Sequence, residues 1–166
     1  MVRPTGKPLN AKAGAWAAAE LASATNEWRA QFRGDARVKD DVAVTARDIA
    51  EHNLILWGDP SSNQILAKIA DKLPVRWDAD NLRVGVKLFP AARYVPVMIF
   101  PNPLNPQKYI VLNSGFTFAA AGSGSNANQT PKLPDFAVFD LDAPAASRVV
   151  LADFFDEQWR LPAAIR

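Results

Sequence analysis

Hydrophobic residues follow the period of an α-helix near the N-terminus. From residue 13 to residue 33 the chain is rich in alanine, and its larger apolar residues recur close to every 3.6 positions. These residues are Trp16, Leu21, Ala24, Trp28 and Phe32. Gly34 follows directly, and glycine commonly ends a helix. The pattern predicts a helix over residues 13–33 that packs on a sheet, preceded by an extended polar arm over residues 1–12.

The pattern becomes that of a buried strand after residue 53. Residues 54–57 read Leu-Ile-Leu-Trp, an unbroken apolar run that is typical of a strand buried on both faces. A Gly-Asp-Pro-Ser-Ser turn follows, residues 63–73 have the helical period, and residues 75–77 begin a second strand. Strand, helix and strand in this order predict a parallel βαβ unit over residues 54–77 with a right-handed crossover.

The strands after residue 82 have connections too short for crossover helices. Only eight residues separate residues 100 and 109, whereas parallel neighbours need about a dozen or more. Strands are predicted at residues 82–89, 95–100, 109–113, 136–141 and 149–155. We therefore predict one α/β domain over residues 13–160, three-layered and Rossmann- or flavodoxin-like, with a mixed sheet. Residues 119–134 are expected to form a flexible surface loop, and residues 161–166 a tail.

Composition narrows the class of protein. The 166 residues are 49% hydrophobic, enough for the core of one domain. The 19 basic and 17 acidic residues are interspersed, which argues against a nucleic-acid partner because such proteins cluster their basic residues. Cysteine is absent, so thiol nucleophiles, disulfides and cysteine zinc sites are excluded. No apolar run is long enough to span a membrane, and Glu20 interrupts the only stretch that resembles a signal peptide. The compartment therefore stays unknown.

The turn after residue 57 is the first place to seek a serine nucleophile. Asp59, Ser61 and His52 are the catalytic candidates around it. An α/β-hydrolase nucleophile occupies such a turn in a Gly-x-Ser-x-Gly context, and here the second glycine is missing. His52 precedes the strand, which at about 3.3 Å per residue places it roughly 20 Å from the turn. A serine and its base must lie within about 3 Å, so His52 cannot activate Ser61.

Ser114 is the remaining catalytic candidate, and two placements of it are open. If strand 109–113 runs antiparallel to residues 54–58, Ser114 lies near His52. If the sheet instead brings the two strand ends together at a switch point, Ser114 lies beside the turn and helps to form a ligand site. The ligand-binding candidates are then Asp59, Ser61, Ser62, Asn63, Asn113 and Ser114. The same residue types also serve as helix caps and turn residues, which is the structural alternative.

Two acidic pairs are the candidates for a metal. Asp40 with Asp41, and Asp140 with Asp142, offer oxygen ligands of the kind that calcium prefers. Neither pair is followed by the glycine and glutamate of an EF-hand loop, and a single histidine excludes His-rich zinc sites. The sequence predicts no cofactor, with calcium as the one alternative left open. A nucleotide-binding flavodoxin-like protein would rest on fold analogy alone, and the chain has no Gly-rich phosphate loop.

Five stretches are distinctive in combination: HNLILWGDPSSN, LPVRWD, VPVMIFPNPLNPQKYIVLNSGFTF, PKLPDFAVFDLD and ADFFDEQW. Over residues 13–160 the chain resembles the C-terminal region of large bacterial prolyl-oligopeptidase-like serine hydrolases of planctomycete-type genomes. The resemblance implies an accessory module beside a catalytic domain, and an extracytoplasmic location. No nucleophile elbow is present in this chain, so no catalytic residue carries over. After NSGFTF this chain continues with small polar residues, where the family tends to have a charged and aromatic segment.

Two hypotheses for the function follow. The first is a non-catalytic accessory domain that binds a catalytic hydrolase domain or another protein surface. The second is a small stand-alone hydrolase of esters or lactones, such as an acyl-homoserine lactone, in which Asp59 activates water with or without calcium. The hydrolase needs a pocket where Asp59 or Ser114 meets a base and a hydrogen-bond donor. If these side chains instead cap the helix after the turn, the accessory hypothesis is favoured.

Overall fold

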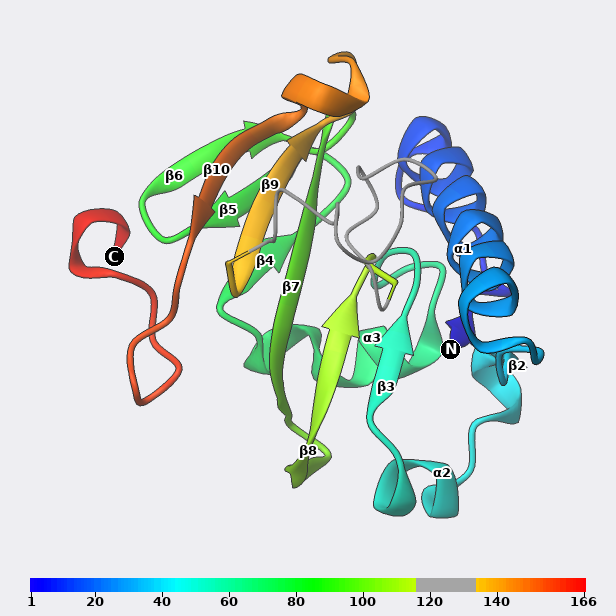
Figure 1. Ribbon diagram of the computed structural model, residues 1–166. Helices are drawn as coiled ribbons and strands as arrows, with labels where there is room; N and C mark the ends of the chain where they lie inside the picture. The colour runs from blue at the N-terminus through cyan, green and yellow to red at the C-terminus, as the bar shows by residue number, and fades with distance from the viewer. Residues whose placement is uncertain (116–133) are drawn as a thin grey trace.

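The computed structural model describes residues 1–115 and 134–166, and of Ala146 only the backbone (Figure 1). Within these residues the chain forms a seven-stranded mixed sheet, a three-stranded antiparallel sheet and three α-helices. The order of the large sheet is β10 (Val149–Asp153), β9 (Phe136–Asp140), β7 (Tyr94–Asn102), β8 (Asn105–Leu112), β3 (Leu54–Leu56), β1 (Val2–Arg3) and β2 (Lys39–Asp40). The small sheet consists of β4 (Val75–Trp77), β5 (Asn81–Val84) and β6 (Lys87–Pro90). The predicted loop at 119–134 lies outside the described residues except for Pro134.

The prediction of a three-layer Rossmann- or flavodoxin-like fold is wrong. Its central assumption was a parallel βαβ unit over residues 54–77, but β4 pairs antiparallel with β5 in the small sheet instead of joining β3. A local turn explains this choice, because the Asp78 carboxylate accepts hydrogen bonds from the backbone N–H groups of Asp80 (2.8 Å) and Asn81 (2.7 Å). The turn directs β5 back along β4, so a nearby hairpin forms in place of a long crossover.

Other predicted strands and pairings agree with the structure. Every predicted strand segment is present, although residues 82–89 divide into β5 and β6 around Gly85, which has a φ of 57°. β7 and β8 pair antiparallel, as their short connection predicts. β8 pairs parallel with β3, with Leu54 opposite Ile110 and Leu56 opposite Leu112. The sheet is therefore mixed, and the ends of β3 and β8 meet at the same edge.

The three α-helices differ in the residues that begin or end them. The long helix α1 (Ala11–Phe32) ends at Arg33, which adopts the left-handed conformation (φ 57°) that was expected of Gly34. The helix α2 (Ala46–Glu51) begins with a capping box, in which Thr45 and Asp48 exchange hydrogen bonds between side chain and backbone. The helix α3 (Gln64–Ile69) is short and continues into a 3-10 turn at Ala70–Lys72.

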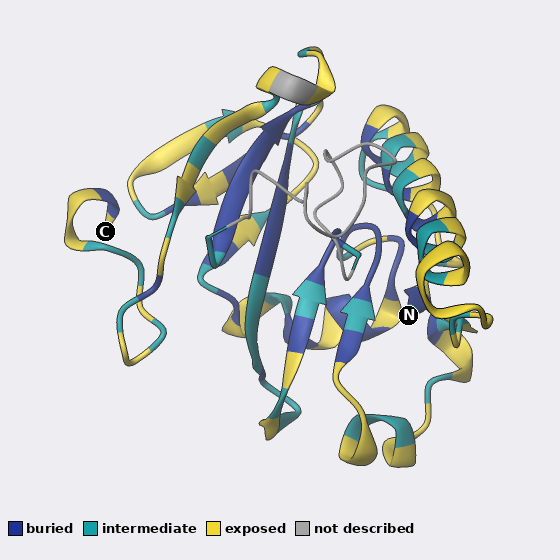
Figure 2. Ribbon diagram, in the orientation of Figure 1, coloured by how far each residue is buried: buried dark blue, intermediate teal, exposed yellow. Residues whose placement is uncertain are grey.

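The hydrophobic core lies on both faces of the large sheet (Figure 2). On one face, Ala13 and Trp16 of α1 pack on β7 and β9, and the rings of Trp16 and Phe139 meet edge to face with centroids 6.1 Å apart. On the other face, α3 and the small sheet cover the strands. The buried residues of that layer include Leu56, Leu66, Ile69, Leu82, Val84, Ile110, Leu112, Phe136 and Val138. No helix among the described residues is long and apolar enough to cross a membrane.

Candidate functional site

Asp59, the main candidate base, is buried, and its carboxylate accepts three hydrogen bonds from backbone N–H groups. The residue is only 1% exposed. Oδ1 accepts hydrogen bonds from the N–H groups of Ser61 and Ser62, both at 2.9 Å, and Oδ2 accepts one from Leu9 N–H at 2.9 Å. The carboxylate thus closes the turn and ties the N-terminal arm to it. These bonds leave it poorly placed to take a proton from a bound water.

The neighbouring polar residues form the start of α3. Ser62 Oγ accepts from Asp59 N–H at 2.9 Å and donates to the Asp59 carbonyl oxygen at 3.2 Å. Asn63 caps the helix, because its Oδ1 accepts from the N–H groups of Ile65 (3.0 Å) and Leu66 (3.2 Å). Ser61 is exposed on the surface. Their roles are those of turn and cap residues.

A carboxylate of the chain itself binds the backbone at the start of α3. Asp41 is 2% exposed, and its Oδ2 accepts a hydrogen bond from Gln64 N–H at 2.6 Å. Its Oδ1 accepts one from Thr5 Oγ1 at 2.7 Å. Burial acts to raise the pKa of Asp41, but these hydrogen bonds outweigh it and hold the pKa below its usual value. Asp41 is therefore a structural anion rather than a calcium ligand.

Asn113 and Ser114 lie beside the turn, not beside His52. The parallel pairing of β3 and β8 decides this and makes the Ser114–His52 arrangement wrong. Asn113 Oδ1 accepts from Gly58 N–H at 2.8 Å, and its Nδ2 donates to the Gly58 carbonyl oxygen at 3.0 Å. Ser114 is 7% exposed, and its Oγ lies 3.4 Å from the Gly115 carbonyl oxygen. The structure thus brings Asp59 and Ser114 to one edge of the sheet, where the side chains of Asp59 and Asn113 are hydrogen-bonded to backbone groups around the turn.

The remaining acidic candidates are paired with basic side chains. Asp140 receives two hydrogen bonds from the Arg93 guanidinium, at 2.7 and 2.5 Å, which lower its pKa to about 2. Asp142 contacts Lys12 and lies 3.2 Å from Arg93, and Asp40 is bonded to Arg3 at 2.6 Å. Within the described residues, no group of three or more His, Cys, Asp or Glu side chains is placed to hold a metal ion.

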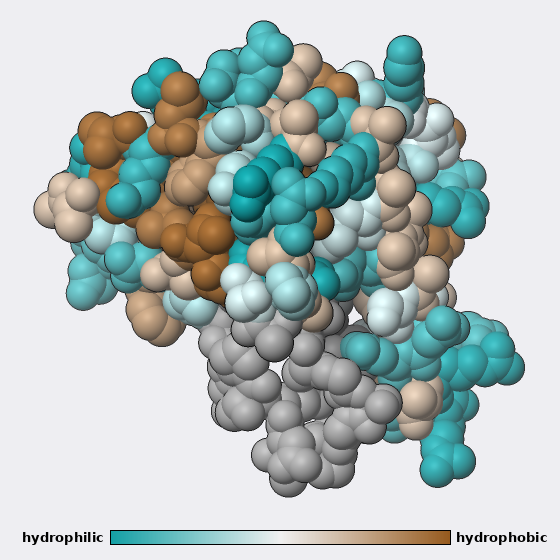
Figure 3. Space-filling view, turned by 90° about the horizontal axis from the view of Figure 1, so that it is seen from above, coloured by the Kyte–Doolittle hydropathy of each residue, from teal (hydrophilic) through white to brown (hydrophobic). Residues whose placement is uncertain are grey.

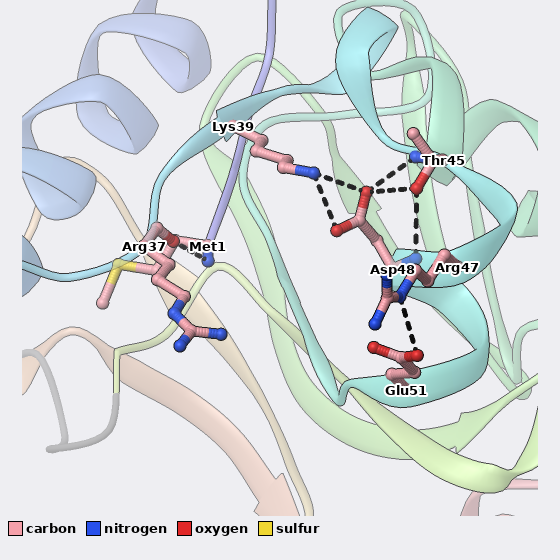
Figure 4. Close-up of polar contacts among 7 residues, drawn as sticks. All are labelled: Met1, Arg37, Lys39, Thr45, Arg47, Asp48 and Glu51. Carbon is pink, nitrogen blue, oxygen red and sulfur yellow. Dashed lines mark hydrogen bonds and ion pairs between the residues drawn. The ribbon is translucent and has the colours of Figure 1, made fainter.

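The structure contains a cavity between the end of α1 and the starts of β1 and β3, which no local sequence pattern indicates. It has a volume of about 700 Å³ and contains His52, which is exposed at the opposite end of β3 from Asp59. Figure 4 shows the polar groups on one side of it. Lys39 forms an ion pair with Asp48 at 2.8 Å, and the Lys39 and Thr45 hydrogen bonds hold the pKa of Asp48 far below its usual range. Arg47 pairs with Glu51 at 2.8 Å on the outer side of α2.

An exposed apolar surface lies at the other end of the large sheet. It consists of Val86 in the turn before β6, Leu88 of β6, Val149 and Val150 of β10, and Phe154, which are 39–67% exposed. We call these five residues the apolar edge. Figure 3 shows hydrophobic residues gathered on the side of the molecule that carries β6 and β10. β10 is also the last strand of the large sheet, so one side of it pairs with no strand among the described residues.

These two surfaces, the cavity and the apolar edge, are the candidate sites that the structure adds. The motif at residues 58–63 that drew attention in the sequence is a joint between the N-terminal arm, β3, α3 and β8. Comparison with known proteins adds no assignment to either surface. No protein-family model, curated protein or solved structure matches the chain.

Proposed function

We propose that the chain is a non-catalytic accessory domain that binds another polypeptide through β10. The observation that carries the proposal is the engagement of Asp59, whose carboxylate accepts three backbone hydrogen bonds. His52 lies at the far end of β3, so it cannot act as a base for Ser61 or Ser114. A hydrolytic centre built from these candidates would need groups that the fold holds apart.

The outer side of β10 offers what an added strand needs. Among the described residues its outward backbone N–H and C=O groups lack a neighbouring strand, and such an edge accepts an extended segment by backbone hydrogen bonding. At five residues the strand is roughly 17 Å long, enough for several ladder bonds. The occupant that fits is therefore an extended segment of a partner protein.

The side chains around β10 indicate the character of that segment. Val149 and Val150 are exposed, whereas Leu151 points toward the core. The strand carries no lysine or proline, the residues that proteins commonly use to prevent edge pairing. Val86, Leu88 and Phe154 add apolar surface nearby. A partner strand with apolar side chains on the face toward the apolar edge would bury this surface.

A catalytic hydrolase domain is the partner class that the sequence resemblance supplies. In large prolyl-oligopeptidase-like hydrolases the region that this chain resembles accompanies such a domain. Binding through β10 would leave the joint at Asp59 in place and would require no chemistry from this chain. No observation in the described residues favours the alternative of a stand-alone ester or lactone hydrolase.

The proposal is tested with the catalytic domain of one of these hydrolases, produced without its own C-terminal region. We expect a one-to-one complex in isothermal titration calorimetry. Val150→Lys should weaken it at least about tenfold, because a lysine on an edge strand opposes pairing. Val42→Lys is the matched control, since Val42 is also an exposed valine (59%) but lies outside the apolar edge, and it should leave binding unchanged.

Three results would overturn the proposal. They are the absence of a complex, equal weakening by both lysine variants, and a homodimer in sedimentation that Val150→Lys dissociates. The last result would assign the edge to a second copy of the chain. Turnover of a p-nitrophenyl ester by the chain alone, lost in Asp59→Asn, would restore the hydrolase hypothesis.

A further inference from the structure

The cavity near the end of α1 has the size of a small-molecule site. Its volume of about 700 Å³ falls within the range of roughly 300–1,000 Å³ that is common for ligand pockets. Within the part of the chain that the structure describes, four segments line it: the last turns of α1, the connection at residues 35–37, β1 with β2, and the segment from α2 into β3. It lies beside β1, β2 and β3, at the opposite end of the sheet order from β10. The cavity and the proposed partner surface are therefore separate parts of the molecule.

The walls of the cavity are largely apolar. Val2 and Leu54 are buried residues that reach it from the sheet, and Trp28 lines it from α1. The ring of Trp28 packs against that of Phe32 with centroids 4.6 Å apart, which restrains the indole. Ile55 adds a further aliphatic side chain. An aromatic ring or short hydrocarbon chain would find favourable contacts along this wall.

Among the described residues around the cavity, one cationic side chain has no counter-ion. Lys39 is neutralised by Asp48 at 2.8 Å, and Asp35 is paired with Arg29 at 3.3 Å. Arg37 also lines the cavity, and among the described residues no side chain or carbonyl oxygen binds its guanidinium. Figure 4 shows this guanidinium turned away from the Lys39–Asp48 pair. The Met1 amino group donates to the Arg37 carbonyl oxygen at 2.6 Å, a bond that fixes the backbone and leaves the side chain available.

We propose that this cavity binds a small hydrophobic carboxylate. The apolar body of the ligand lies against Trp28, Val2 and Leu54, and its carboxylate accepts hydrogen bonds from Arg37. A guanidinium presents two parallel N–H groups that match a carboxylate, and such charge-assisted pairs are among the stronger hydrogen bonds in proteins. A cationic ligand is disfavoured, because the carboxylates of Asp35 and Asp48 already have partners.

The test uses 2-naphthoate as the probe and 2-naphthalenemethanol as its uncharged analogue. Binding is followed by ¹H–¹⁵N correlation spectra of the full chain, which report affinity and location together. We expect naphthoate to shift the amide signals of Val2, Leu54 and Ile55, and the alcohol to bind at least about tenfold more weakly. Arg37→Gln should weaken naphthoate at least about tenfold and leave the alcohol unaffected.

Arg83→Gln is the matched control, because Arg83 is an exposed arginine on β5 that does not line the cavity. It should leave naphthoate binding unchanged. Trp28→Leu should weaken both probes by a similar factor, since it alters the apolar wall and not the charge. Equal affinity for acid and alcohol, no effect of Arg37→Gln, signal shifts confined to the apolar edge, or no binding at millimolar probe would each overturn the proposal.

Discussion

Replacing Asp59 by alanine tests whether the turn after β3 is a structural joint. The carboxylate accepts hydrogen bonds from the N–H groups of Leu9, Ser61 and Ser62, all at 2.9 Å. Leaving a buried donor without a partner costs about 1 kcal/mol or more. The Ser62 N–H keeps a second acceptor, the Asp59 carbonyl oxygen at 3.1 Å, so its loss is partly offset. We therefore expect Asp59→Ala to lower the free energy of unfolding by about 2–3 kcal/mol.

Urea denaturation followed by circular dichroism measures this change. For a chain of this size, about 2–3 kcal/mol corresponds to a fall in Tm of roughly 5–10 °C. Asp59→Asn should lie between wild type and alanine, because its single amide oxygen can replace only part of the carboxylate. Asp71→Ala is the matched control, since Asp71 is exposed and should change the free energy of unfolding by less than about 0.5 kcal/mol.

The opposite result would refute the reasoning. If Asp59→Ala unfolds at the same urea concentration as wild type, the three hydrogen bonds contribute little to stability. The structural role of Asp59 would then be refuted, and a catalytic role would need to be tested again. If Asp71→Ala is destabilised as strongly as Asp59→Ala, the loss would reflect a general effect of removing an acidic residue and not the joint.

Two further predictions concern other polar contacts of the fold. In urea denaturation, Asn113→Ala should lower the free energy of unfolding by about 2–4 kcal/mol, because it removes both hydrogen bonds to Gly58 and places alanine at φ 53°. Asn113→Gly should recover about 1 kcal/mol of this loss, because glycine adopts the positive φ without strain. NMR titration should give a pKa of about 2 for Asp140, and Arg93→Gln should raise it toward 3.8. Because the pKa of Asp140 is depressed in the folded state, the stabilisation from the Asp140–Arg93 pair is present above pH 3.8 and is lost as the pH falls through about 2. A wild-type pKa of Asp140 near 3.8 would contradict the ion pair.

Several local features of the fold could be predicted from the sequence because they depend on neighbouring residues. The apolar run at 54–57 indicated the buried strand β3, and the short connection between residues 100 and 109 indicated the antiparallel β7–β8 pair. Thr45 and Asp48 stand at the spacing of a capping box, and the structure forms one. The polar turn after β3 was also recognised as a possible set of cap residues. Each of these depends on spacing within one segment, which the sequence displays directly.

The candidate sites could not be predicted in the same way. The cavity needs the end of α1, Arg37 and His52 to meet, and these residues belong to different elements. The apolar edge depends on β10 being the last strand of the sheet, and a strand at the centre would carry the same valines as core residues. Basic residues at 37 and 39 were visible in the sequence, but nothing local separated them from ordinary surface residues.

The sequence by itself determined where the strands, turns and helix caps form, because periodicity and capping act over a few residues. Only the tertiary structure decided which strands pair. β4 joined β5 through the Asp78 turn and not β3, and β3 took β8 as its parallel neighbour. Which strands pair depends on the free energies of contacts between distant segments. The hydrophobic pattern of one segment does not select its neighbour, because any neighbour that buries the same face fits it. The strand pairing placed Ser114 beside Asp59 instead of His52, and it put the cavity and the apolar edge at opposite ends of the large sheet.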